Sequence, residues 1–199
     1  MNALEVIFQH RSIRKYKNEK ISDDILLNIL KAATRAATNG NMQLYSIIIT
    51  TDEEDKKALM PLHFNQEMVL DAPVLLTFCA DLNRFTKWCQ YRNANPGYDN
   101  LLFLLSAIAD TILASQNAIL TAESYGLGTC ILGTPLYTAR EHIEFFDLPK
   151  LVLPVIAVTV GYPDENPPLT DRLPLEAVIH QGKYQDYDKN AIDLYFEEK

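Results

Sequence analysis

One stretch constrains the fold of this chain more than any other: LLFLLSAIADTILASQNAILTA, at residues 101–122. As a helix it is long and apolar enough to span a bilayer. It also carries Asp110, Gln116 and Asn117, polar side chains that are costly in hydrocarbon unless they are paired. A helix that is apolar almost all round is equally typical of a buried central helix. We therefore expect a core or oligomer-interface helix and no membrane span.

Shorter patterns on both sides of this stretch predict further elements. Helical periods and capping residues predict helices at residues 2–9, 22–37 and 51–59, and a short one that opens with a capping box at Thr138. Apolar and β-branched runs predict strands at 44–51, 74–80, 126–134 and 152–163. We expect a loop with one helical turn at most at 82–100, where no period is clear, and a Pro-rich, then irregular tail from Asn166. The mixed order indicates an α+β fold, a sheet wrapped by helices, in one domain of 199 residues.

The composition argues against several classes of protein. A net charge of −8 and a pI near 5.0 do not suit a nucleic-acid-binding surface, which needs a basic face. Cys79, Cys89 and Cys130 form no C-x-x-C pair, so we expect reduced thiols and neither a zinc site nor a disulfide framework. The start of the chain is too polar for a signal peptide, and we expect a cytoplasmic protein. The P-loop, G-x-G-x-x-G, H-E-x-x-H and G-x-S-x-G motifs are all absent from the sequence.

Against this acidic background, the segment HRSIRKYK at residues 10–17 gathers four basic side chains. Arg11 and Arg14 each offer a planar fork of donors that suits phosphate, and Ser12 adds a hydroxyl. The segment is therefore a candidate anion site. The alternative is a solvated basic end of the preceding helix, or a surface patch that binds a protein or lipid partner.

Three further segments carry candidate binding groups. Residues 37–43 cluster amide side chains that could read the edge of a planar heterocycle, although Asn39 or Gly40 could instead cap a helix. The glycines in GLGTCILGT, residues 126–134, could admit a ligand to the backbone or simply allow tight packing. Arg172 lies between prolines, where it is either a fixed phosphate clamp or a surface residue.

Taken in order, these segments resemble the FMN-dependent nitroreductase family. The likeness runs from HRSIRKY through ATNGNMQLYSIII, the D-x-x-x-A-x-Q-N pattern of residues 110–117 and AESYGLGTCILG to GYPDENPPLTDRLPLEAVIHQGKY. It covers nearly the whole chain and is nearest to the branch of type A, oxygen-insensitive nitroreductases and NADPH–flavin oxidoreductases. Each motif is modest by itself, but the ordered set is specific.

The resemblance implies a set of FMN-binding residues. Arg11, Ser12 and Arg172 would meet the phosphate end, and Arg14 would lie near the flavin pyrimidine. The segment 38–43 would come from a partner subunit, and the strand end at 132–134 would point a backbone N–H at flavin N5. The implied residues are His10, Arg11, Ser12, Arg14, Thr38, Asn39, Asn41, Gln43, Gln66, Leu132, Gly133, Thr134 and Arg172.

The resemblance also implies a fold and a reaction. The fold is a central, mostly antiparallel sheet in an intertwined homodimer, with FMN at the subunit interface and the tail from about 166 to 199 extended over the partner. The reaction is ping-pong hydride transfer from NAD(P)H through FMN to small planar acceptors such as nitroaromatics, quinones or flavins. The implied chemistry needs no metal and no catalytic side chain, because the flavin performs the redox step. A non-catalytic flavin-binding or redox-sensing protein is the alternative.

Two positions depart from the family pattern. Thr170 stands where type A enzymes usually carry a lysine, so we expect one phosphate contact to be lost and FMN to be held less tightly. In that branch, basic residues for NADPH lie in a C-terminal extension beyond the position of Lys199. The choice between NADH and NADPH, and the physiological acceptor, are left open.

Overall fold

The computed structural model describes residues 2–97 and 100–197 of the chain. They divide into two compact units, Met1–Pro167 and Pro168–Lys199, and each unit is described by itself. The first unit contains the sheet and nearly all of the predicted site residues. The second unit is the C-terminal tail.

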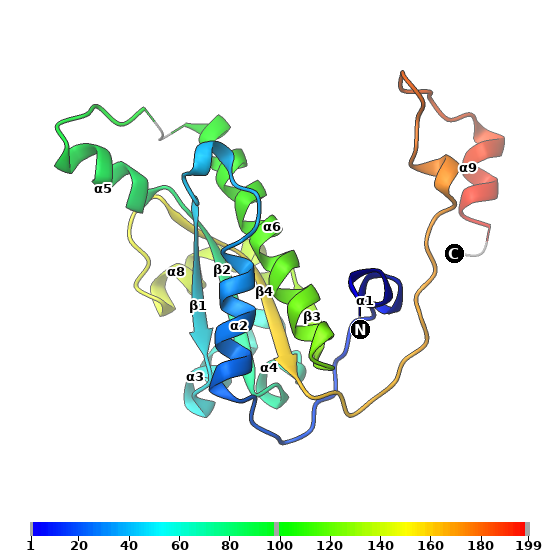
Figure 1. The fold of residues 1–199 in the computed structure, drawn as a ribbon, viewed down its shortest axis with the longest axis horizontal. Coiled ribbons are helices and arrows are strands. Elements are labelled where there is room, and N and C mark those ends of the chain that lie inside the picture. Colours follow the sequence, from blue (N-terminus) through cyan, green and yellow to red (C-terminus); the bar gives the residue numbers. More distant parts are fainter. Residues whose placement is uncertain (1, 98–99, 198–199) are drawn as a thin grey trace. The chain divides into compact units, whose positions relative to one another are not determined.

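The first unit is built on a four-stranded sheet with the strand order β1-β2-β4-β3. Every neighbouring pair is antiparallel, as expected for a mostly antiparallel sheet (Figure 1). The strands are β1 (Tyr45–Thr50), β2 (Val74–Asp81), β3 (Gly128–Leu132) and β4 (Val152–Gly161), so all four predicted strands are confirmed.

Helices cover both faces of this sheet. Leu76, Phe78 and other side chains on one face pack against α2 and α6, which lie side by side (Figure 1). Leu75, the next residue along β2, points to the opposite face and packs with residues of α3 and α4. The helices described in this unit are α1 (Ala3–Gln9), α2 (Asp23–Ala33), η1 (Asn39–Asn41), α3 (Glu53–Leu59), η2 (Met60–His63), α4 (Met68–Asp71), α5 (Asn83–Tyr91), α6 (Leu101–Ser124), α7 (Thr134–Tyr137) and α8 (Ala139–Phe145).

The long apolar stretch forms α6, as expected. Asn100 caps it by accepting a hydrogen bond from the backbone N–H of Phe103 at 3.2 Å. Small buried residues such as Ala114, Ala118 and Ala122 let the helix pack closely in the core it shares with α2. By length and composition α6 could cross a membrane, but it is the central helix of this core, and its Asp110 is buried in a hydrogen-bonded cluster.

Another face of α6 is apolar and exposed. Leu101, Leu105 and Ile112 fall on one stripe of the helix, and Leu102 and Leu113 widen it. Their exposed fractions run from 46% to 69%. Apolar residues on soluble surfaces are normally scattered singly, whereas these five form one contiguous face.

The expectation for the segment 82–100 was wrong in part. Residues 83–91, expected to be loop with one helical turn at most, form α5, in which Phe85 stacks on Trp88 and Cys89 is buried. Only Phe85, Trp88 and Cys89 mark the apolar side of this helix, and the residues around them are mostly polar. The helical periodicity is therefore weak in the sequence. The turn expected at 95–100 includes residues 98 and 99, which lie outside the described residues.

Two local details concern the capping of helices. Helix α8 begins after Thr138 as predicted, but the Thr138 side chain does not cap it. Its hydroxyl instead donates to the carbonyl of Leu62 at 2.9 Å and ties α8 to η2. Gly40 is left-handed with φ 54°, yet it does not cap the preceding helix, because α2 ends at Ala33 with Thr34 as its C-cap.

The second unit is partly helical, where an irregular tail was expected. It contains η3 (Leu175–Ala177) and α9 (Lys189–Tyr195), which Asp188 caps through the backbone N–H of Ala191. The hydroxyl of Tyr187 donates to the carbonyl of Ala177 at 2.6 Å and holds the turn between these elements. The pattern of α9 is short and flanked by polar residues, so it gives a weak helical signal.

Candidate functional site

The segment HRSIRKYK is held as an extended chain along the edge of the sheet. The backbone N–H of Ile13 donates to Thr129 on β3 at 2.8 Å, and Ser12 forms an isolated parallel bridge with the same residue. On its other side, the carbonyl of Lys15 accepts from the backbone N–H of Asp164 at 2.9 Å. Glu165 adds its carboxylate, which accepts from the backbone N–H groups of Arg14 and Lys15. The segment is therefore a fixed part of the fold.

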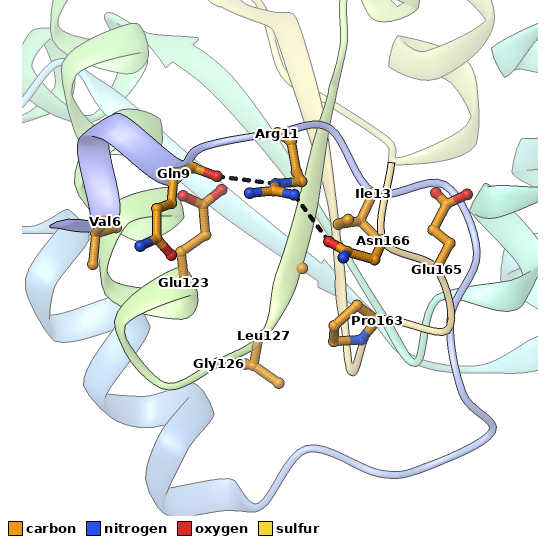
Figure 2. Close-up of a pocket in the computed structure, with 11 residues that line it drawn as sticks. Val6, Gln9, Arg11, Ile13, Glu123, Gly126, Leu127, Pro163, Glu165 and Asn166 are labelled. Atoms are coloured by element: carbon orange, nitrogen blue, oxygen red, sulfur yellow. Dashed lines mark hydrogen bonds between the residues drawn. The ribbon is translucent and has the colours of Figure 1, made fainter. Parts of the chain in front are cut away.

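Arg11 is half-buried, which argues against a freely solvated basic end. Its guanidinium donates to Asn166 Oδ1 at 2.9 Å and to the carbonyl of Pro167 at 3.0 Å, and its Nε donates to the carbonyl of Gln9 at 3.2 Å. Figure 2 shows the guanidinium between Gln9 and Asn166. Arg14, Lys15 and Lys17, in contrast, are exposed.

A cavity of about 220 Å³ lies beside Arg11 and is lined partly by Val6, Ile13 and Leu127. Glu123 and Glu165 also line it, on either side of Arg11 in Figure 2. Two carboxylates make this cavity unsuitable for a phosphate. A ligand anion would therefore have to meet Arg11 from outside this cavity.

His10 faces one of these carboxylates. Its Nδ1 lies 2.7 Å from Glu123 Oε1, and the hydroxyl of Thr129 donates to the same oxygen at 2.7 Å. Glu123 is the penultimate residue of α6 and is buried. This contact ties the start of the basic segment to the C-terminal end of α6.

Leu132, Gly133 and Thr134 lie where β3 ends and α7 begins. Leu132 is three residues along β3 from Thr129, which is about 10 Å at the rise of a strand. The space beside Gly133 is open, because a Cβ built there would meet no atom within 4 Å. The strand end and the basic segment thus share β3 as their scaffold.

Gln66 reaches the same region through a buried histidine. Its side-chain amide donates to the carbonyl of His63 at 2.9 Å, and His63 Nδ1 lies 2.5 Å from the hydroxyl of Thr134. His63 is fully buried, with its Nε2 3.4 Å from Nε2 of His142. The structure therefore brings Gln66 and Thr134 together around His63.

Burial keeps both histidines neutral. Desolvation, and to a lesser degree the neighbouring His142, lowers the pKa of His63 from 6.5 to about 4. Desolvation likewise lowers the pKa of His142. Because Nδ1 of His142 contacts the carbonyl of Thr138 at 2.9 Å, it carries the proton and donates there. His63 then donates through Nε2, and its Nδ1 accepts from the hydroxyl of Thr134.

The amide-rich segment lies elsewhere on the chain. Thr38 Oγ1 donates to Asp110 Oδ2, and the backbone N–H of Asn39 donates to Asp110 Oδ1 at 2.9 Å. Asn41 and Gln43 are exposed and linked to each other, since Gln43 Nε2 donates to Asn41 Oδ1 at 2.8 Å.

Within one subunit, this amide-rich segment and the basic segment are attached to different parts of α6. Asp110, which holds residues 38–43, and Glu123, which contacts His10, are thirteen residues apart. That separation corresponds to about 20 Å along the helix axis.

Arg172 belongs to the second unit. It is exposed, and its guanidinium donates to Thr170 Oγ1 at 2.6 Å and to the carbonyl of Asp171 at 3.0 Å. Thr170 thus holds the arginine where the family pattern has a lysine.

Cys130 lies on the strand that carries the basic segment. It is buried on β3, and burial raises its pKa, as expected for a packing cysteine.

The predicted residues of the first unit therefore form two groups. The residues held together along β3 and η2 are His10, Arg11, Ser12, Arg14, Gln66, Leu132, Gly133 and Thr134; the residues held at Asp110 are Thr38, Asn39, Asn41 and Gln43. The sequence reasoning gave no role to His63, Glu123 or Glu165. A carboxylate near the end of an apolar helix is unusual, and this could have drawn attention to Glu123 in the sequence. No such pattern marks His63, because its buried partners are distant in sequence.

The comparisons with known proteins identify the family. The sequence model of the Nitroreductase family matches residues 7–162. The chain belongs to the Nitroreductase family, and its α+β sheet has the fold of that family.

Individual relatives match along nearly the whole chain. The oxygen-insensitive NADPH nitroreductase of Salmonella typhimurium is 36% identical over 196 residues, which are 98% of this chain and 80% of the relative. The structure of NfrA2 from B. megaterium is 38% identical with a TM-score of 0.96, covering 100% of this chain and 81% of that one. NADPH:FMN oxidoreductase from Vibrio harveyi, solved with NAD⁺, is 31% identical with a TM-score of 0.93. The match covers 100% of this chain and 84% of that one.

Proposed function

We propose that this chain transfers hydride from NAD(P)H through FMN to small planar acceptors such as nitroaromatics, quinones or flavins. It is an NAD(P)H-dependent flavin oxidoreductase, an activity supported by relatives named as an NADPH nitroreductase and an NADPH:FMN oxidoreductase. The observation that carries the proposal is the group of donors fixed along β3, which ends beside the open space at Gly133.

The residues present fit FMN. Arg11 and Ser12 would hold the phosphate, since a half-buried arginine fork and a hydroxyl on a fixed strand are suited to an anion. Arg14 is exposed and free of an ion pair within the described residues, so it would supply a cation at the flavin pyrimidine. Gly133 leaves room for a flat ring, and Gln66 and Thr134 would flank it.

Bound FMN would supply the redox chemistry between the nicotinamide and the acceptor. The chain's own residues bind and orient it. His63 fixes the Thr134 hydroxyl as a donor into its ring, so the lone pairs of that oxygen are left to accept from a ligand N–H. No side chain is assigned as an acid or base, since water or substrate can provide the protons.

The division of the site residues supports a homodimer. Within one chain, the segment 38–43 is attached to α6 about 20 Å from the attachment of the basic segment. A second copy would bring its own segment 38–43 to the first copy's β3. The exposed apolar face of α6 would supply buried area for such an interface. The tail from about residue 166 would extend over the partner, where Arg172 would act as a phosphate clamp.

The remaining parts of the proposal concern the setting of the reaction. The protein acts in the cytoplasm, where its three free cysteines stay reduced. Thr170, in place of a lysine, leaves the phosphate with one cation fewer, so FMN is held less tightly than by a chain with a lysine there.

Steady-state kinetics test the proposal. The protein saturated with FMN should oxidise NADH or NADPH when a quinone or nitroaromatic is present, with parallel lines in double-reciprocal plots, as ping-pong kinetics require. A fully flavinated protein that remains inactive with both nucleotides would favour the alternative, a flavin-binding redox sensor.

A further inference from the structure

The segment 38–43 has an unusual backbone. Gly40, Asn41 and Gln43 are all left-handed, with φ values of 54°, 56° and 49°. Residues with a Cβ adopt this conformation at a cost of about 1 kcal/mol or more each. Such a backbone persists only where its surroundings hold it. What holds this segment therefore decides where its amide side chains point.

Asp110 holds the segment from the side of the helix. Its carboxylate is 2% exposed and receives the hydroxyl of Thr38 and the backbone N–H groups of Asn39 and Leu44, the last at 3.2 Å. The Thr38 hydroxyl in turn accepts from the backbone N–H of Gln43 at 2.9 Å. Both ends of the segment thus close on one buried carboxylate.

Arg84 holds the C-terminal end of the segment. Its guanidinium donates to the carbonyl of Gln43, to that of Tyr45 at 2.9 Å and to Ser46 Oγ at 3.3 Å. Asp81, which is buried at the end of β2, lies 3.6 Å from the same guanidinium. The anion accepts from donors at both ends of the segment, and the cation binds the carbonyl of its last residue, Gln43, and anchors it to the start of β1.

We propose that Asp110 and Arg84 are positioning residues for FMN, each acting through segment 38–43 on the site of the partner subunit. This inference rests on the proposed function. Neither side chain needs to touch the flavin. Their effect is to keep Asn39, Asn41 and Gln43 exposed in one fixed geometry, so that little ordering remains when FMN binds.

The first test compares FMN affinity among matched variants. Asp110→Asn replaces an acceptor oxygen with an amide donor where several donors converge, and should weaken FMN binding about tenfold or more. Thr111→Val is the control, because Thr111 is buried beside Asp110 but its hydroxyl bonds Ala107 within α6. It should bind FMN like the wild type. Arg84→Gln changes an exposed side chain and replaces Asp110→Asn in every comparison if that variant does not fold.

The second test asks on which subunit the segment acts. Arg11→Ala damages the basic segment, so a mixed dimer of Arg11→Ala and Asp110→Asn chains distinguishes two arrangements. If the segment serves the partner's site, one site of the mixed dimer is intact and half of the sites regain wild-type affinity. A merely structural loss in the Asp110→Asn chain would restore no site.

The outcomes separate the inference from the function on which it rests. Weakened binding in Asp110→Asn, unchanged binding in Thr111→Val and recovery of half of the sites support the inference. Wild-type affinity in both Asp110→Asn and Arg84→Gln, or no recovery in the mixed dimer, overturns it. A wild-type protein that does not bind FMN at all contradicts the proposed function instead.

Discussion

At the scale of single residues, two glycines near the ends of β3 have opposite surroundings. A Cβ at Gly133 would meet no atom within 4 Å, and its φ of −81° suits any residue. A Cβ at Gly128 would lie 2.6 Å from Cγ1 of Ile13. Gly133 therefore lies beside open space, and Gly128 allows the basic segment to pack against the strand.

We predict that Gly133→Ala folds with an unchanged or slightly higher Tm but binds FMN about tenfold or more weakly, because the methyl group enters the space of the flavin. Thermal unfolding and flavin titration measure the two effects. Gly128→Ala is the matched control and should lose about 1–3 kcal/mol of stability through overpacking. Undiminished FMN affinity in Gly133→Ala would place the ring elsewhere.

The buried His63 predicts a dependence of stability on pH. Its pKa is about 4 in the folded chain and near 6.5 when unfolded, so the unfolded state binds the extra proton between these values. The stability that comes from keeping His63 neutral is complete above pH 6.5 and is lost as pH falls toward 4. The loss reaches up to about 3 kcal/mol. Denaturant unfolding at a series of pH values should show this slope, and His63→Gln should remove most of it.

At the scale of elements, α6 performs two tasks. One face packs on α2 and the sheet, and another carries the exposed leucines and isoleucine. Its buried carboxylates Asp110 and Glu123 attach the two groups of predicted site residues to the same helix. The spacing of those groups is therefore set by helix geometry.

We predict that Leu105→Lys with Ile112→Lys converts the proposed dimer to monomers, because lysine cannot be buried unpaired in an interface without a large desolvation cost. FMN should be lost together with the dimer, with affinity falling at least about tenfold. Sedimentation equilibrium with and without FMN measures both. The same change at Ile49, an exposed apolar residue of β1, is the control and should leave the assembly intact. A double variant that stays dimeric would remove α6 from the interface.

The sequence predicted most elements and missed those with weak local signals. Strands β1, β2, β3 and β4 and helix α6 have long apolar runs, so their positions follow from periodicity. Helices α5 and α9 are short, and their apolar positions are separated by polar ones. The prediction that Thr138 caps α8 was wrong, because its hydroxyl donates to a tertiary partner, the carbonyl of Leu62.

At the scale of the whole molecule, the proposed site draws on two copies of the chain, and this limits what one sequence can reveal. The resemblance predicts a set of site residues, but it does not predict that Asp110 and Arg84 hold the segment 38–43. Asp110 and Thr38 are far apart in sequence, and no local pattern links them. The same holds for His63 and Thr134. Such contacts follow from the sheet and helix packing, which periodicity does not specify.

An acidic chain can hold an anion through local donors. Its net charge is −8, yet Arg11 and Ser12 are fixed on the edge of the sheet by backbone hydrogen bonds. A few donors at a defined place determine local affinity, whereas total charge mainly affects solubility and long-range attraction.

Titration of the ligand-free protein with FMN tests the central claim most directly, with bound flavin followed by its visible absorbance and the assembly followed by sedimentation. The account predicts saturation at one FMN per chain, in a dimer, with the bound flavin bleached by NADH or NADPH. A colourless protein that takes up no FMN at micromolar concentrations would contradict the assignment of the β3 group as a flavin site.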